Sequence, residues 1–251
     1  ISSLAVNNPS GSGICNGVFF ATSFSSNVPV AYSWSNGSTS SAIMGLCSGI
    51  HTLTLTDAAG CILDTTLLLG SLSGCSDSTA LNYNLLVTVD DGSCIYQKTY
   101  VPDNNFENYL EANGMGDGIL LNDSVFTSAI DTLTYLYVNG SNIADLTGIE
   151  DFYSIKTLYC SDNQLTNLDI SNNLFLTKLA CDNNQFTIFD LGNNIVLTEL
   201  WCSNNLLLTQ LDVSGAAALN KLHCSFGQLT SLDVSNNTAL VDLGCSNNQL
   251  T

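Results

Sequence analysis

Ten cysteines are the residues of this 251-residue chain best able to form bonds or hold a metal. Five of them recur at an interval of 21 or 22 residues, and they are Cys160, Cys181, Cys202, Cys224 and Cys245. Zinc requires ligands clustered around a tetrahedron, whereas these cysteines follow a linear repeat. We therefore predict a ladder of small hydrophobic core side chains, about 5 Å apart in stacked coils.

Two further cysteines, Cys75 and Cys94, bracket a short loop outside this repeat. In an oxidising compartment such a pair predicts a disulfide. Hard oxygen ligands crowd the same loop, namely Asp77, Asn82, Asn84, Asp90 and Asp91. Calcium prefers such donors, so we predict a calcium site, although the spacing differs from an EF-hand. The alternative is a solvated acidic turn closed by the disulfide.

The composition argues against nucleic-acid binding, membrane binding and catalysis. The chain has 22 acidic residues, four lysines and a formal net charge of −18, so it would repel nucleic acid and anionic membranes alike. It has no arginine and two histidines, His51 and His223, neither with a sequence-identifiable nucleophile or carboxylate partner. We therefore expect a protein that is not an enzyme.

The cysteine interval belongs to a longer repeat that must position these side chains. Each unit has the pattern L-x-x-L-x-C-x-x-N-x-L, followed by a second apolar pair such as Phe189 and Leu191. Both halves of a coil are therefore predicted to be short strands. One coil cannot bury this surface alone, so stacked coils must share a core, which predicts a solenoid over residues 133–251. The recurring asparagine should satisfy backbone groups of adjacent coils.

This pattern is that of the leucine-rich repeat, and its short form with cysteine in a core position resembles the cysteine-ladder internalins. Internalins are bacterial surface adhesins, so the resemblance implies binding without chemistry.

One face of the predicted solenoid varies from coil to coil while the core stays constant. Its candidate ligand-binding residues, on a concave strand face, are Tyr135, Tyr137, Tyr159, Lys178, Glu199, Trp201, Lys221 and His223. Exposed aromatic side chains on a rigid surface are good anchors for a protein or a glycan. Ordinary stacking of exposed aromatics between coils is the alternative.

A cap is expected in front of the repeats, over residues 98–132. Residues 103–114 read as a short helix with Asp103 as N-cap, Gly114 as the stop, and Phe106 and Leu110 at helical spacing. We predict that this helix covers the first coil and leaves a polar face to solvent.

Residues 1–70 have short alternating apolar runs between Gly, Ser and Asn, which predicts an Ig-like β-sandwich. Strands B and F of such a sandwich run the same way, which places Cys15 and Cys47 at one end. A second disulfide between them is expected, leaving Cys61 unpaired. The phrases around Cys15, residues 32–37 and residues 46–61 resemble the SprB-type repeat of Bacteroidetes gliding adhesins.

The segment 71–97 resembles a Cys-bounded module of secreted proteins from the same bacteria, with similarity to the calcium loops of thrombospondin type 3 repeats. Four tripeptides resemble Bacteroidetes O-glycosylation sites, with acceptors at Thr65, Ser78, Ser124 and Thr132. These likenesses imply a secreted or outer-surface glycoprotein, exported by the type IX route.

The sequence thus favours a mainly β, modular surface binding protein of the adhesin type. Alternatives are a structural segment of an extracellular filament or coat, in which the chain contacts itself, and an accessory domain of a larger secreted enzyme. No apolar run is long enough to span a bilayer. Because the chain starts at Ile1 and ends within a repeat at Thr251, we expect it to be part of something longer.

Overall fold

The computed structural model describes residues 3–9, 15–22 and 26–251. The predicted 1–70 module contains residues 1–2, 10–14 and 23–25, which lie outside the described residues. The chain forms two compact units, residues 1–95 and 96–251.

Two three-stranded antiparallel sheets make up the first part of the chain. One has the order β1-β2-β4 and the other β3-β5-β6. Their bounds are Ser3–Asn7 (β1), Gly17–Thr22 (β2), Ala42–Leu46 (β4), Ala31–Trp34 (β3), Gly49–Thr56 (β5) and Ile62–Leu69 (β6). Side chains from both sheets share one core, in which Phe19 stacks on Trp34 at 5.8 Å between ring centroids. Two sheets packed over one core agree with the expected β-structure of this segment, and its Ig-like form stays a prediction.

Both predicted disulfides are present. Cys15 is bonded to Cys47 beside the sandwich, and Cys75 to Cys94 in the small module that follows. That module has only a two-residue parallel pair, β7 (Ser73–Gly74) with β8 (Val89–Asp90). With so little sheet and core, the module depends on its disulfide and turns.

The cap of the solenoid joins a helix to an antiparallel pair. It comprises β9 (Lys98–Tyr100), α1 (Asn104–Ala112), β10 (Ser124–Phe126) and the 3₁₀ turn η1 (Thr127–Ala129). Asp103 caps α1 as predicted, since Oδ1 accepts hydrogen bonds from the backbone N–H of Asn105 and Phe106. Its Oδ2 accepts from the N–H of Ala144 and Asp145, so one carboxylate ties the helix to the first coil.

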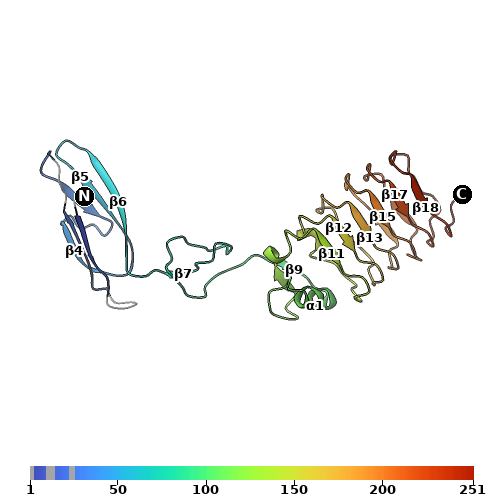
Figure 1. Ribbon diagram of the computed structural model, residues 1–251, viewed down its shortest axis with the longest axis horizontal. Helices are drawn as coiled ribbons and strands as arrows, with labels where there is room; N and C mark the ends of the chain where they lie inside the picture. Colours follow the sequence, from blue (N-terminus) through green and yellow to red (C-terminus); the bar gives the residue numbers. More distant parts are fainter. Residues whose placement is uncertain (1–2, 10–14, 23–25) are drawn as a thin grey trace. The chain divides into compact units, whose positions relative to one another are not determined.

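A six-stranded parallel sheet runs along the solenoid (Figure 1). Its strands, one per coil, are β11 (Tyr135–Tyr137), β12 (Thr157–Tyr159), β13 (Lys178–Ala180), β15 (Glu199–Trp201), β17 (Lys221–His223) and β18 (Asp242–Gly244). A 3₁₀ turn, η2 (Ile149–Asp151), lies in the first coil. The apolar residues of cap and coils form one continuous core, as the repeat period requires.

The ladder cysteines lie in this core as free thiols. Four are buried, and Cys245 in the last coil is half-buried. Burial raises the pKa of each buried thiol, to about 12 at Cys224. These cysteines therefore pack as small, unreactive hydrophobes.

Asparagines hold neighbouring coils together. The Asn184 amide donates to the carbonyls of Cys160 and Cys181 at 3.0 and 3.1 Å, and Asn163, Asn205 and Asn248 repeat this arrangement. A second, buried asparagine column was not predicted; it consists of Asn173, Asn194 and Asn237. The expected bonding between coils is therefore confirmed and is more extensive than expected.

The second half of each coil corrects one prediction. Within residues 26–251, only β14 (Ile188–Asp190) and β16 (Gln210–Asp212) form paired strands there. This half ends in a turn in which an Asp accepts a hydrogen bond from the N–H two residues later, at Asp169 as well as at Asp190 of β14 and Asp212 of β16. The same turn therefore follows paired and unpaired segments alike.

Candidate functional site

The strand face of the solenoid brings the predicted contact residues together in two columns. Parallel pairing without a register shift places Tyr137, Tyr159, Ala180, Trp201, His223 and Gly244 in one column. The adjacent column holds Tyr135, Thr157, Lys178, Glu199, Lys221 and Asp242. The rigid core fixes both columns, so their spacing is set by the sheet and not by loops.

Aromatic side chains cluster at the cap-side end of this face. Tyr159 lies 5.7 Å from Tyr135 and 6.0 Å from Tyr137, between ring centroids, in edge-on and tilted arrangements. Tyr135 and Tyr137 are about half exposed, while Tyr159 is half-buried. Partial desolvation, with smaller contributions from the neighbouring tyrosines, raises the pKa of Tyr135. All three tyrosines offer both a ring face and a hydroxyl.

Charged side chains form a chain of pairs beside the aromatic column. Glu199 lies 3.3 Å from the Lys178 ammonium and 3.9 Å from that of Lys221. The Glu199 side chain is 15% exposed and each lysine 43%, so the carboxylate is held between two accessible ammonium groups. Further along, His223 Nε2 lies 3.3 Å from Asp242 Oδ1, without hydrogen-bond geometry.

The half-buried carboxylate of Asp182 lies two residues after Ala180 of the aromatic column. Asp182 Oδ1 accepts a hydrogen bond from the N–H of Ser203 at 2.8 Å, and Oδ2 is within 3.5 Å of the Ser161 hydroxyl. Desolvation raises its pKa despite these bonds. The strand face therefore combines aromatic rings, paired lysines and hydroxyl or carboxylate acceptors, which suits noncovalent recognition.

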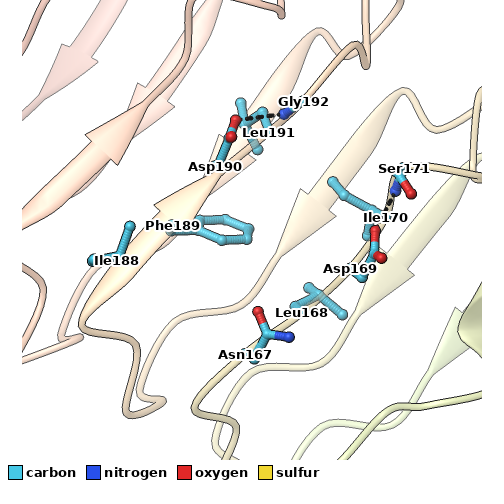
Figure 2. A pocket seen from close by; sticks show the side chains of 10 residues that line it. All are labelled: Asn167, Leu168, Asp169, Ile170, Ser171, Ile188, Phe189, Asp190, Leu191 and Gly192. Atoms are coloured by element: carbon cyan, nitrogen blue, oxygen red, sulfur yellow. Dashed lines mark hydrogen bonds between the residues drawn. The ribbon is translucent and has the colours of Figure 1, made fainter.

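Three shallow grooves lie instead on the opposite side of the coils. The groove in Figure 2, of about 380 Å³, separates residues 167–171 from residues 188–192. The two others, of about 740 and 300 Å³, follow the same side.

A column of aspartates along these grooves was missed by the sequence analysis. Asp169 and Asp190 each accept a hydrogen bond from the N–H two residues on, as Figure 2 shows, and Asp212 and Asp233 repeat the turn. Those N–H donors, with serine hydroxyls, lower the pKa of Asp169, Asp212 and Asp233. The recurring L/F-D-x-S/G phrase in the sequence was the available signal. Its role in the structure is to end each coil's second half.

The predicted calcium loop is closed by its own hydrogen bonds. Asp90 accepts from the N–H of Gly92 and the hydroxyl of Ser76, and Asp91 accepts from Ser93. Asp77, Asn82 and Asn84 likewise bond to nearby backbone groups. In the described part of the chain no three His, Cys, Asp or Glu residues gather as a metal site. Calcium binding by the oxygen ligands of this loop stays a prediction.

The four predicted glycan acceptors have different surroundings. Ser78 and Thr132 are exposed, and Thr65 is half-buried on β6. The Ser124 hydroxyl lies 3.2 Å from Asp117 Oδ2 and 3.1 Å from Asn122 Oδ1, inside a network that also holds Lys98. Ser124 is therefore the poorest acceptor of the four in the folded chain.

The described residues include no helix long and apolar enough to cross a bilayer. No protein-family model matches the chain. Internalin J of Listeria monocytogenes serotype 4b is 39% identical to it over 74 residues, which make up 30% of this chain and 8% of that relative. The match thus spans a small part of the relative's length.

Solved structures of internalins resemble the solenoid. The functional domain of InlJ from Listeria monocytogenes, which includes a cysteine ladder, matches at 31% identity with a TM-score of 0.36, covering 62% of this chain and 44% of that one. InlF of the same species matches at 21% identity with a TM-score of 0.34, over 61% and 65% of the chains. The repeat, the ladder and the sequence match together define an internalin-like leucine-rich-repeat solenoid.

Proposed function

We propose that this chain is part of a non-enzymatic, extracellular adhesin-type protein that binds a protein or glycan through the strand face of its solenoid. The observation that carries this proposal is the contrast between a constant core and a varied face. The five coils from Cys160 to Cys245 keep their leucine and cysteine positions and four of them keep the asparagine, whereas the two outward columns change from tyrosine to lysine, glutamate, tryptophan and histidine. Stability requires only the constant positions, so the varied ones are free to serve recognition.

The chemistry of this face supports a protein or glycan ligand. Tyrosine and tryptophan rings contribute most binding energy at many interfaces, at low entropic cost. The lysines beside them can pair with acidic groups of a ligand. Three of the chain's four lysines, Lys156, Lys178 and Lys221, lie in or directly before strands of this sheet.

An extracellular location accords with the cysteine chemistry. Two disulfides close the sandwich and the small module, and disulfides persist in oxidising compartments. The buried ladder thiols have raised pKa values, which protects them from oxidation there. Sequence similarity to Internalin J favours the same location, because the internalins that this repeat resembles are bacterial surface proteins.

An Ig-like fold for residues 1–70 and O-linked glycosylation are also part of what we propose. The sheet orders β1-β2-β4 and β3-β5-β6 correspond to the A-B-E and C-F-G strands of an Ig-like sandwich that lacks strand D. This order supports the Ig-like reading of residues 1–70, whereas the SprB-type reading, and with it an origin in gliding bacteria, rests on the sequence phrases around Cys15, residues 32–37 and residues 46–61. O-linked glycans at Ser78 and Thr132 would appear as extra intact mass in protein from the native host.

Binding to glycan arrays and to panels of extracellular proteins tests the proposal. Ligands found with the wild-type chain should bind at least about tenfold more weakly to Trp201→Ala or Tyr159→Ala, since losing a central aromatic anchor costs about 2 kcal/mol or more. The matched control is Tyr153→Ala, an exposed aromatic outside the strands, which should bind normally. Equal binding by all three variants, each with an unchanged unfolding temperature, would place the contact surface elsewhere.

A further inference from the structure

The outer edge of β6 has a surface feature that the strand face does not explain. β6 is the edge strand of its sheet, and among the described residues no strand pairs with its free side. An edge strand presents backbone N–H and C=O groups that can pair with another chain. Natural edges are usually short or interrupted, or carry lysine or proline.

None of these protective features is found in β6. Its sequence, ILDTTLLL, runs for eight residues without Gly, Pro or Lys. By comparison, β3 has four residues, β1 has five, and β4 contains Gly45 at a φ of 74°. β6 also exposes Ile62 (66%), Leu63 (49%) and Leu68 (38%). It is therefore the edge best suited to accept a further strand.

The sequence of β6 is complementary to itself in one antiparallel register. With a twofold axis at Thr65, Ile62 lies opposite Leu68 of a second copy, Leu63 opposite Leu67, and Asp64 opposite Thr66. Apolar residues then face apolar ones and polar residues face polar ones. Moving the axis to Asp64 would oppose two carboxylates, and moving it to Thr66 would set Asp64 against Leu68.

This register also keeps the two faces of the sheet consistent. Leu53 and Leu55 of β5 are buried, and they pair with Thr65 and Leu63, so the odd-numbered residues of β6 face the core. Opposite residues in an antiparallel pair lie on the same face. An axis at Thr65 therefore joins odd positions to odd positions and places both cores on one side of a continuous six-stranded sheet.

Charge does not oppose this contact. The whole chain has a net charge of −18, but its first 70 residues contain two aspartates, Asp57 and Asp64, and no Glu, Lys or Arg. The Asp64 carboxylate accepts a hydrogen bond from the Thr54 hydroxyl at 2.6 Å, on its own sheet. Self-repulsion is thus weakest in the part of the chain that carries this edge.

We propose that two copies of this chain associate through antiparallel pairing of their β6 strands, with the axis at Thr65. The inference is independent of the proposed function of the strand face. A glycan on Thr65 would block the pairing, so the test uses protein from a host that adds no O-linked glycans.

A charge-swap experiment tests both the contact and its register. Sedimentation velocity of the full chain should show a concentration-dependent dimer, and the double variant Ile62→Lys/Leu68→Lys should raise its dissociation constant at least about tenfold, because the introduced lysines face each other. Ile62→Glu/Leu68→Glu should do the same, and mixing the two variants should restore the dimer. Met44→Lys, at an exposed apolar position of the other sheet, is the control and should leave it unchanged.

A cysteine cross-link gives a second measurement if the charged variants fail to fold. In a Cys61→Ser background, Thr65→Cys should form an intermolecular disulfide on mild oxidation, since the residue on the axis faces its own copy within disulfide reach. Thr66→Cys faces Asp64 instead and should cross-link much less. A chain that stays monomeric up to its solubility limit, a dimer insensitive to the lysine pair, or equal cross-linking at both positions would each overturn the proposal.

Discussion

Replacing Asn184 by alanine should destabilise the solenoid by about 1.5–4 kcal/mol, a value that follows from its hydrogen bonds. Asn184 Oδ1 accepts from the Leu165 N–H at 3.0 Å, and Leu165 is fully buried, so that N–H would lose its partner at a cost of about 1–3 kcal/mol. The carbonyls of Cys160 and Cys181 would each keep one other asparagine donor. Their weakening adds roughly 0.5–1 kcal/mol in total.

The assay is guanidinium unfolding of the full chain by circular dichroism, together with hydrogen exchange of the strand-sheet amides, which reports the solenoid separately from the sandwich. Gln185→Ala, at the exposed neighbouring position, is the control and should stay within about 0.5 kcal/mol of wild type. A loss below about 1 kcal/mol for Asn184→Ala would refute the view that this column couples the coils.

Three further predictions concern titration, reactivity and metal. In the native chain at pH 8, a thiol reagent should label Cys61 quickly and the four buried ladder cysteines only after unfolding, because burial raises their pKa. Hydrogen bonds from Lys98 and Asn122 outweigh desolvation and lower the pKa of Asp117 to about 2. Because the pKa of Asp117 is lower in the folded state than in the unfolded state, this stabilisation is complete above pH 4 and lost toward pH 2. In thermal unfolding, Asp117→Asn should therefore cost about 1–2 kcal/mol at pH 7 and almost nothing at pH 2. Chelation should lower the melting temperature of the 71–97 module and added calcium should restore it; an unchanged temperature would remove the calcium prediction.

The solenoid could be predicted from sequence because its evidence is repeated. The interval of 21 or 22 residues between the cysteines from Cys160 to Cys245 determines which residues stack. The two columns of the strand face can therefore be predicted by aligning the coils on these cysteines. The N-cap of α1 was equally accessible, since Asp103 precedes a helical apolar pattern. In each case a local rule and the global fold demand the same residue type.

The second half of the coils was harder to predict for a physical reason. Alternating pairs such as Leu168 and Ile170 suit a strand, and the turn that Asp169 closes on Ser171 recurs after the paired strands β14 and β16, so it does not decide which segments pair. Pairing depends on the neighbouring coil, and β14 and β16 form where two compatible segments are adjacent. The edge character of β6 also depends on strand order, which alternation alone does not give.

The coil between Cys202 and Cys224 is one residue longer than its neighbours, and the extra residue lies near Leu206 and Leu207, both exposed. Trp201 nevertheless pairs with His223 and Glu199 with Lys221, without a shift. The length of a coil and the residues on the strand face can therefore change independently. A mutation can lengthen a coil at its edge, and change the surface there, without altering the residues that the strand face presents.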